Sequence, residues 1–417
     1  MRRCLLVLLA LTAHPAAAER SPAPGGAVRV HVSPQLRERT TEALVHAPLA
    51  EPARWTRGPI LDAAHPPLRG TAVRSTVLTR LEREGDAWLL GSPLPAAELV
   101  AVLDACFAPD GPWPGRALAA SGVTLEARAD ALGVRVITSR PVSPLPSLLT
   151  GCSLPHGPFE SSADGWSSRG DVLVAGVSLD TEPSTADLTF LGEGSELLSA
   201  PWPDVLLLVP DAAARDADPF ELDGGDGLAR FQTELAPDLL LAVRHQGRGA
   251  GTRGLLPPGV GPDRPAPGLT DRAPVDPTLV PLPPGAPGLT LTHAAGDPLA
   301  ADLADRLALL LRGRGWSTSG GPSARIVRWR PSTDDPALAM LELAALVDLP
   351  APATLLDGAL ADRTEAALSL ERSWLREGRV VPLLTAALWY SVSPRLRGVR
   401  IRGDGVPLLA DAWWTTP

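Results

Sequence analysis

The sequence predicts an exported α/β protein, and three observations lead to this fold class. Short apolar segments with strand-like alternation are interspersed with helical segments along the 417 residues. Hydrophobic residues make up 45% and charged residues 20%, which is typical of a globular chain with a packed core. The first 18 residues have the features of an export signal. At about 150 residues per domain, the length allows two or three domains.

The N-terminal segment determines the expected compartment. Arg2 begins a basic start, residues 5–11 form a short apolar run, and Ala16–Ala18 offer a small-residue cleavage site. The run is too short to span a bilayer. Cys4 precedes it, whereas a lipid-anchored cysteine would follow it. We therefore expect residues 1–18 to be a cleaved signal peptide, and the protein to be periplasmic and not a lipoprotein.

The composition excludes several functions. The chain has no lysine, so all 38 basic residues are arginine. Pyridoxal phosphate catalysis and the P-loop both need a lysine, so both are excluded. The net charge of −9 argues against a nucleic acid partner, because phosphate neutralisation needs a basic surface.

The first part of the chain has the alternation of several strands around a helix. Residues 95–107 (PAAELVAVLDACF) predict a helix that begins at a proline and has one apolar face. Strands are expected over residues 27–32, 123–127, 134–138, 172–179 and 204–209.

A proline-rich segment then separates this part from a second α/β pattern. Residues 254–287 hold eleven prolines and predict a linker or crossing segment. Beyond it, the helix 297–312 has Asp297 as its cap and Pro298 at its first position. The other expected elements are strands 289–292 and 325–329, helices 336–347 and 359–377, and a closing strand pair at 399–402 and 406–409.

None of the local sequence motifs indicates a catalytic, metal or nucleotide site. GAGTRG at 249–254 has glycine spacing like a phosphate loop, but the Leu-Leu-Pro-Pro that follows cannot open a helix. The sequence has no H-E-x-x-H, C-x-x-C or G-x-S-x-G motif. Asp334 and Asp335 are adjacent, so their side chains diverge and they make a poor catalytic pair. We expect no catalytic residues, no metal site and no cofactor.

The order of segments resembles the extracytoplasmic solute-binding proteins of ABC importers, family 5, of the oligopeptide-, dipeptide- and nickel-binding type. The best match is the C-terminal segment 359–414, with its Glu- and Arg-rich helix, apolar strand and final Trp. GLTLTHAAGDPLAADLADRLALLLRGRGWST at 288–318 looks like the family's strand–helix unit, and GLLPPG at 254–259 its proline-rich crossing. Residues 134–159 and 85–105 are similar to two further segments, in the same order. The chain is shorter than usual for the family.

This resemblance implies a two-lobed periplasmic-binding-protein-like fold (type II, cluster C) with an extra subdomain inserted in the first lobe. The implied domains are the signal peptide 1–18, a first lobe of 19–46 with 155–249 and 396–417, an inserted subdomain of 47–154, and a second lobe of 250–395. The implied protein is a monomer that closes on its ligand by hinge motion.

The resemblance also directs attention to RIVRWRPSTDDP at 325–336. In peptide-binding members, an acid three residues after a Trp holds the ligand's α-amine. Here Trp329 matches, but the position of the acid is Ser332, and a hydroxyl cannot form the charge-assisted bond to an ammonium. Asp334 could substitute from nearby. Otherwise the ligand lacks a free amine, or the protein has left transport.

Aromatic side chains supply the other candidate ligand-binding residues. Of 17 aromatics, 11 are Trp, which offers a flat apolar face and one N–H donor. The candidate cleft walls are Trp88, Trp166, Trp329, Trp389 and Tyr390. For each of them, ordinary core packing is the alternative. Arg328 and Arg330 flank Trp329 on a strand, so both point away from the cleft if Trp329 faces it.

The leading hypothesis is a periplasmic solute-binding protein that delivers a peptide-like or other small solute to an ABC transporter permease. A secreted sensory or binding protein without transport is the first alternative, and a secreted hydrolase the second. Cys106 and Cys152 remain after signal cleavage and can form a disulfide or stay as two buried thiols.

Overall fold

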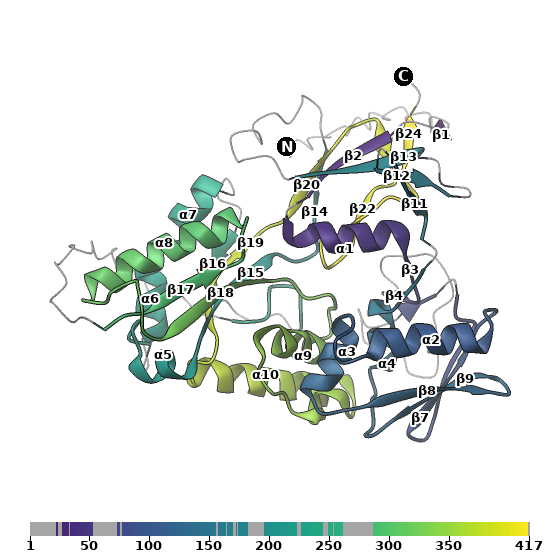
Figure 1. The fold of residues 1–417 in the computed structure, drawn as a ribbon, viewed down its shortest axis with the longest axis horizontal. Coiled ribbons are helices and arrows are strands. Elements are labelled where there is room, and N and C mark those ends of the chain that lie inside the picture. Colours follow the sequence, from purple (N-terminus) through teal and green to yellow (C-terminus); the bar gives the residue numbers. More distant parts are fainter. Residues whose placement is uncertain are drawn as a thin grey trace, which may run out of the picture.

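The structure is a computed structural model of the chain. It describes residues 22–23, 27–32, 34–52, 73–75, 77–155, 157–163, 165–169, 172, 174–181, 196–222, 227–244, 249–252, 254–261 and 287–415. The expected signal peptide and most of the proline-rich segment lie outside these residues. Figure 1 shows three bodies: a first lobe at the upper right, a second lobe at the left, and a subdomain at the lower right.

A five-stranded sheet forms the centre of the second lobe. Its order is β16 (Gly249–Gly251), β19 (Val381–Ala386), β15 (Asp204–Pro210), β18 (Ser323–Trp329) and β17 (Thr290–His293). Only the β17–β18 pair is parallel. Along β15, Val205 and Leu207 enter one hydrophobic core while Leu206 and Leu208 enter another. This alternation places a core on each face of the sheet.

Helices cover both faces of this sheet. α6 (Gly227–Leu235), α7 (Pro237–Arg244) and α8 (Pro298–Gly313) pack on one face, and α9 (Pro336–Val347) and α10 (Leu360–Arg376) on the other. The short α5 (Ala212–Ala217) follows β15. α8 begins as the sequence predicts, because Asp297 accepts the Ala300 N–H at 3.1 Å and Pro298 follows it.

The first lobe contains a smaller sheet and the end of the chain. Its strand order is β11 (Phe159–Ser162), β12 (Gly165–Ser168), β13 (Gly176–Thr181) and β2 (Ala27–Val32), beside α1 (Pro34–Val45). The C-terminal strands β21 (Leu396–Arg397), β22 (Arg400–Ile401), β23 (Pro407–Leu408) and β24 (Trp413–Thr415) complete it, and β1 (Pro22–Ala23) pairs with β24. Their apolar side chains share one core with those of β2 and β13.

The subdomain is a four-stranded antiparallel sheet with two principal helices. The strand order is β6 (Arg80–Glu84), β7 (Ala87–Gly91), β9 (Gly133–Thr138) and β8 (Leu125–Asp130), with α2 (Ala96–Phe107) and α3 (Trp113–Ala120). α4 (Leu145–Leu148) and a 3₁₀ turn (Leu149–Gly151) follow, and β4 (Glu51–Pro52) pairs with β5 (Val73–Arg74). The strand pair β3 (Ala47–Pro48) and β10 (Ser153–Leu154) joins the subdomain to the first lobe.

A disulfide connects the end of α2 to the segment that leads back to the first lobe. Cys106 and Cys152 are bonded, with 5.2 Å between their Cα atoms, and both are buried. Of the two arrangements that the sequence left open, the structure has the disulfide. It closes a loop with a sequence separation of 46 residues.

Two neighbouring chain segments connect the first and second lobes. β14 (Glu196–Ser199) pairs with β20 (Trp389–Val392), and the Ala200 N–H donates to the Leu388 carbonyl at 2.9 Å. β15 follows one segment and β19 precedes the other. Trp202, in the segment between β14 and β15, is buried and donates its Nε1–H to the Pro331 carbonyl at 2.9 Å. These two segments are the connections between the two lobes within the described part of the chain.

The sheet changes the expected lobe boundary. Residues 204–249 were assigned to the first lobe, but β15 lies between β18 and β19 in the second lobe's sheet. The side chains of α5, α6 and α7 share the core of that same sheet. Conversely, β20 lies within the residues expected in the second lobe, but it pairs with β14 and not with a strand of the second-lobe sheet. The proline-rich segment used to place the boundary marks a change of composition, whereas strand pairing, which the sequence does not display, groups these elements with one sheet or the other.

Candidate functional site

A cavity of about 510 Å³ lies where the first lobe, the second lobe and the subdomain meet. α1 and the turn between β22 and β23 line it from the first lobe, and the loops before α3 and after α4 from the subdomain. Ser332, just after β18, is its second-lobe residue. The other principal polar and aromatic lining residues are Arg39, Glu42, His46, Asp110, Trp113, Arg116, Arg402 and Asp404. A cavity enclosed by all three bodies changes shape when the bodies move.

A buried carboxylate behind the cavity residue Ser332 connects the second lobe to the first. Glu342 on α9 is 5% exposed and accepts hydrogen bonds from the Ser332 backbone N–H at 2.7 Å and hydroxyl at 2.8 Å. Across the cleft, Arg39 of α1 lies 3.4 Å from the same carboxylate. Burial raises the pKa of Glu342 above its ordinary value, although Arg39 and the two Ser332 donors oppose this shift.

A second ion pair lies beside it, on the first-lobe wall. Arg402 donates to both Asp404 oxygens, at 2.8 Å and 2.5 Å. Burial disfavours the charged form of Asp404, but the charge and hydrogen bonds of Arg402 outweigh it, so the pKa of Asp404 is lowered. The wall therefore keeps an ionised carboxylate, while the carboxylate on α9 is held less firmly in its ionised form.

The structure brings few of the sequence-predicted residues to the cavity. Ser332 lines it. Asp335, beside Asp334, caps α9 and pairs with Arg363 at 2.7 Å. Asp334 itself is half-buried and does not line the cavity.

The predicted aromatic walls are mostly packed elsewhere. Trp88 is buried in the subdomain core and donates its Nε1–H to the Val142 carbonyl at 3.0 Å. Trp329 is 2% exposed and packs in the core that includes α9. For both, core packing replaces the expected cleft wall. Trp166 is half-buried against the first-lobe core, and the side chain of Trp389 lies outside the described part.

Tyr390 stays close to the junction of the lobes. It is half-buried on β20, and its hydroxyl donates to the Gly405 carbonyl at 2.8 Å. The turn that carries Gly405 also carries Asp404 of the cavity wall. Tyr390 therefore supports this wall from the side of the β14–β20 pair.

Sequence reasoning missed the residues that make the cavity polar. Glu342 is the one charged residue of the apolar helix 336–347 (PALAMLELAALV), and an unexplained charge on a buried helix is a signal that could have revealed it. Trp113 lines the cavity just after the exposed Asp110. Arg39 and Arg402 had no such signal, because arginines are frequent throughout this chain.

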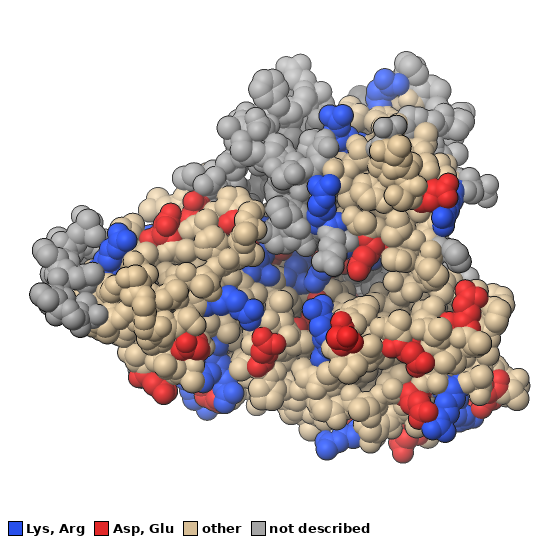
Figure 2. Space-filling view, viewed as in Figure 1, with Lys and Arg blue, Asp and Glu red and all other residues tan. Residues whose placement is uncertain are grey.

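The charges on the visible face are mixed. Figure 2 shows acidic and basic side chains interspersed over the second lobe, the subdomain and the first lobe, without a large patch of one sign.

Within the part of the chain that the structure describes, no group of three His, Cys, Asp or Glu is placed to hold a metal ion. Among the described helices, none combines the length and apolar character needed to cross a membrane.

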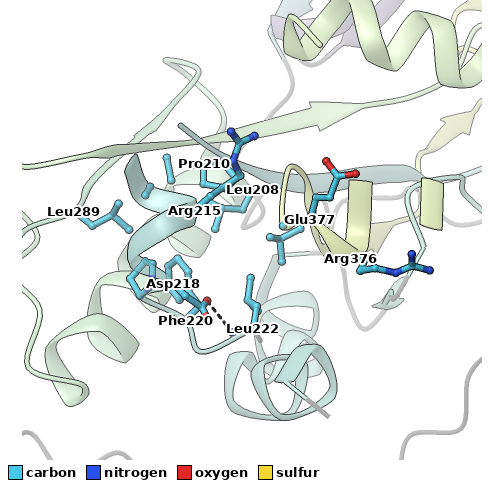
Figure 3. A pocket seen from close by; sticks show the side chains of 14 residues that line it. Leu208, Pro210, Arg215, Asp218, Phe220, Leu222, Leu289, Arg376 and Glu377 are labelled. Atoms are coloured by element: carbon cyan, nitrogen blue, oxygen red, sulfur yellow. Dashed lines mark hydrogen bonds between the residues drawn. The ribbon is translucent and has the colours of Figure 1, made fainter. Parts of the chain in front are cut away.

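A second pocket, of about 250 Å³, lies within the second lobe and away from the first. Figure 3 shows apolar side chains such as Phe220 and Leu222 lining it, with Arg215, Asp218 and Glu377 at its edges. Asp218 uses its carboxylate to accept the Leu222 N–H at 2.8 Å. This pocket has walls from one lobe only, so closure of the lobes does not change it.

No family model and no curated protein sequence matches the chain. Solved structures do match it. The dipeptide-binding protein of Pseudoalteromonas sp. SM9913, in complex with Met-Leu, has a TM-score of 0.64 and 12% identity over 94% of this chain and 100% of that chain. The oligopeptide-binding protein AppA from Bacillus subtilis, in complex with a nonapeptide, has a TM-score of 0.65 and 10% identity, and the match covers 95% of this chain and 100% of that chain.

A third solved structure has a different type of ligand. The binding protein MoaA from A. tumefaciens R10, in complex with mannopinic acid, has a TM-score of 0.62 and 13% identity, and the match covers 94% of this chain and 100% of that chain. Together, these similarities show that the chain has the two-lobed α/β fold of periplasmic binding proteins. The two-lobed periplasmic-binding-protein-like fold that the order of segments predicted is thereby confirmed.

Proposed function

We propose that this chain, which has the periplasmic-binding-protein fold, is a divergent solute-binding protein of the oligopeptide-, dipeptide- and nickel-binding type. It captures a peptide-like or other small solute between its lobes and delivers it to an ABC transporter permease. It is exported after cleavage of residues 1–18, is not lipid-anchored, and has no catalytic function. The fold and the order of sequence segments support the family, and the cavity supports the function.

The observation that carries this proposal is the cavity between the three bodies. Its volume of about 510 Å³ lies within the range typical of small-molecule sites. Ser332, which Glu342 holds from behind, contributes from the second lobe, while Arg39 and Asp404 contribute from the first. A solute bound there contacts both lobes at once, so its binding energy favours the closed arrangement.

The cavity fits a solute that carries both polar and charged groups. Glu42, Asp110 and Arg116 line its accessible part, and all three are exposed. The strand–loop residue Ser332 is neutral, but Glu342 lies directly behind it and supplies a carboxylate there. Arg39, whose side chain is 35% exposed, holds that carboxylate in this structure and can be displaced by a solute's cationic group.

Ligand capture is tested first with a thermal-shift screen of residues 19–417 against pools of peptides, amino acids, sugars and metals. A solute that binds only the folded protein raises the melting temperature with concentration, following RT ln(1 + [L]/Kd). Small-angle scattering with the active pool then measures whether the radius of gyration decreases. We expect a peptide or amino-acid pool to give both effects. If no pool raises the melting temperature and none decreases the radius of gyration, ligand capture is wrong.

Delivery to a permease distinguishes transport from a secreted sensory role. We expect uptake of the active solute into membrane vesicles that contain the cognate permease and ATPase to require this protein. Binding without uptake would favour the sensory alternative. Turnover of any active pool, followed by chromatography, would favour a secreted hydrolase.

N-terminal sequencing of the protein exported to the periplasm tests cleavage after Ala18.

A further inference from the structure

The second-lobe pocket of about 250 Å³ lies at the end of the sheet that points away from the first lobe. Ser332 of the cleft follows the last residue of β18, whereas Ala324, near the start of that strand, lines the pocket. The antiparallel β15 contributes Leu208 and Pro210 from its last residues. The cleft and the pocket therefore lie at opposite ends of the same strands, and no lining residue is common to the two.

The inner wall of this pocket is apolar and firmly packed. Leu208, Leu289 and Val381 are each at most 2% exposed, and their side chains belong to the core that includes α8. Phe220 is 3% exposed and packs against Phe231 of α6, with 5.2 Å between the ring centroids. An apolar group that enters the pocket leaves water and gains contacts with these side chains, which favours its binding.

The turn at 218–221 forms one side of the pocket and has an unusual backbone conformation. Asp218 and Glu221 have φ angles of 39° and 53°, in the left-handed region that residues other than glycine rarely adopt. The Glu221 N–H donates to the Asp218 carbonyl at 3.0 Å, and the Asp218 carboxylate accepts the Leu222 N–H at 2.8 Å. These bonds hold a strained turn in place, which is typical of a wall that is formed before a ligand arrives.

The charged side chains at the mouth of the pocket differ in their hydrogen bonding. Glu377 accepts the Arg379 Nε–H at 2.5 Å, and Asp218 uses its carboxylate within the turn. Arg215 is half-buried and has no hydrogen-bond acceptor among the described residues, although Glu377 attracts it through charge. In Figure 3, Arg215 lies at the same edge as Glu377, whereas Arg376 extends away from the pocket. The unused hydrogen-bonding capacity at the mouth is therefore that of a donor.

We propose that this pocket binds a short monocarboxylate, with its apolar body against Leu208 and Phe220 and its carboxylate on Arg215. A guanidinium offers a planar pair of donors that matches a carboxylate. The volume of about 250 Å³ holds about eight atoms at the ~30 Å³ that a water molecule occupies in the liquid. The body of the ligand is therefore a short chain or a single ring. A single half-buried cation favours one carboxylate over a multiply charged phosphate.

This second site goes beyond the proposed function and does not depend on it. All the residues that line the pocket belong to the second lobe, so opening and closing of the lobes leave its walls unchanged. A ligand with equal affinity for two states does not shift the equilibrium between them. The monocarboxylate therefore binds whether or not a solute is held in the cleft.

The probe is hexanoate, a carboxylate with an apolar chain of the size that the pocket holds. Hexanamide has the same shape without the charge, hexylamine has the opposite charge, and acetate has the carboxylate without the chain. Calorimetric titration measures the affinity of residues 19–417 for all four compounds.

Two variants and two matched controls locate the site. Arg215→Gln removes the cation, and Leu222→Asp places a negative charge on the half-buried wall. Arg372→Gln removes an exposed arginine that pairs with Glu365 on α10, and Leu239→Asp replaces a leucine of α7 that is 69% exposed. Neither control residue lines the pocket.

We expect the wild type and both controls to bind hexanoate more tightly than hexanamide or hexylamine. Acetate should bind at least about tenfold more weakly, since each buried methylene contributes about fourfold. Arg215→Gln should weaken hexanoate binding about fivefold or more. Leu222→Asp should also weaken it, because like charges repel, and this variant keeps Arg215 and carries the test if the glutamine variant does not fold. No binding of hexanoate by the wild type, equal binding of hexanoate and hexanamide, or unchanged affinity in either variant would overturn the inference.

Small-angle scattering distinguishes this pocket from the cleft. Hexanoate should leave the radius of gyration of the wild type unchanged, and a decrease would place the ligand between the lobes and contradict the inference. Hexanoate binding that depends on Arg215, with no solute pool able to close the lobes, retains this site and removes the proposed function. A solute that closes the lobes while hexanoate fails to bind leaves the proposed function standing and removes this site.

Discussion

The second lobe meets the subdomain and the first lobe through two very different interfaces. Against the subdomain, α3 packs on α9, and a single hydrophobic core runs through both bodies. Backbone hydrogen bonds from Ala351 to Ala120 (3.2 Å) and from Ser143 to Leu356 (2.8 Å) reinforce that contact. Against the first lobe, the contacts around the cavity are polar and charged.

This difference indicates which bodies move together. Separating the apolar interface would expose hydrophobic surface to water, whereas separating the charged one exposes groups that water solvates well. The subdomain is connected by its chain to the first lobe through β3 and β10, but it is attached by packing to the second lobe. We therefore expect the subdomain and second lobe to move as one body against the first.

The largest expected effect comes from breaking the apolar interface. Ala344 is fully buried on α9 and shares a surface groove with Ala120 of α3. Ala344→Asp places an unpaired charge in this interface, and we expect it to lower the free energy of unfolding by about 3 kcal/mol or more. Urea denaturation followed by tryptophan fluorescence measures the loss. Ala345→Asp, at the neighbouring half-buried position, is the control, and an equal loss there would contradict the assignment.

The next effect comes from the disulfide, which stabilises the subdomain side of the same interface. Reducing it, or replacing Cys106 and Cys152 together by Ser, should lower the free energy of unfolding by about 2–4 kcal/mol. Denaturant curves with and without reductant measure this, and the double variant should no longer respond to reductant. Thiol titration of the unreduced, unfolded protein lacking residues 1–18 should detect no free thiol.

A smaller effect is expected from the charged interface. Arg39→Gln removes the ion pair with Glu342, and its effect on stability should stay within about 1 kcal/mol because Arg39 is partly exposed. Its effect on shape should be larger, since it favours lobe opening and so raises the ligand-free radius of gyration in small-angle scattering. Arg128→Gln removes the exposed pair with Glu126 in the subdomain and should leave the radius unchanged. No difference between the two variants would count against a closing role for Arg39.

The smallest effect is a pH dependence at the same interface. The pKa of Glu342 is raised above 4.5 in the folded state, so the folded protein holds this proton more tightly than the unfolded chain. Its contribution to stability is therefore greatest below pH 4.5 and declines as the pH rises through the raised value. Compared with the wild type, Glu342→Gln should gain relative stability between pH 4.5 and neutrality. A constant difference across that range would contradict the raised pKa.

The stability contribution of Asp404 should change with pH in the opposite direction to that of Glu342. Its pKa is lowered in the folded state, so its contribution is present above its ordinary value of 3.8 and is lost as the pH falls through the lowered value. Denaturation of Asp404→Asn over the acid range should show a difference from wild type that shrinks as the pH falls. The two variants together separate the contribution of Asp404 in the cavity wall from that of Glu342 behind Ser332.

Most elements of the fold followed from local patterns in the sequence. The helix 297–312 was predicted from Asp297, Pro298 and its leucine spacing, and α8 spans Pro298–Gly313. The strand at 204–209 was predicted from its apolar run, and β15 spans Asp204–Pro210. Both signals lie within one segment of chain, so sequence alone reveals them. The sheet to which β15 belongs depends on pairing with residues more than a hundred positions away, and the sequence analysis did not predict that pairing.

The site was less predictable for the same reason. Ser332 was named from its place in a recognisable segment, and it does line the cavity. Its partner Glu342 lies 10 residues away, and Arg39, the partner of Glu342, lies 303 residues from that carboxylate, so only folding brings them together. Trp329 was expected at the cleft because of its chemistry, but the alternation of β18 directs it into the core that includes α9, while Arg328 on the other face pairs with Asp297 at the start of α8.

The pairing of β1 with β24 places both described ends of the chain in the first lobe, as Figure 1 shows at the upper right. An anchor attached near either end therefore holds the first lobe and leaves the rest free to swing. A fluorophore at Leu132, the exposed tip of the β8–β9 hairpin, would then travel with the larger body. Surface-tethered single molecules labelled in this way would report each opening and closing directly.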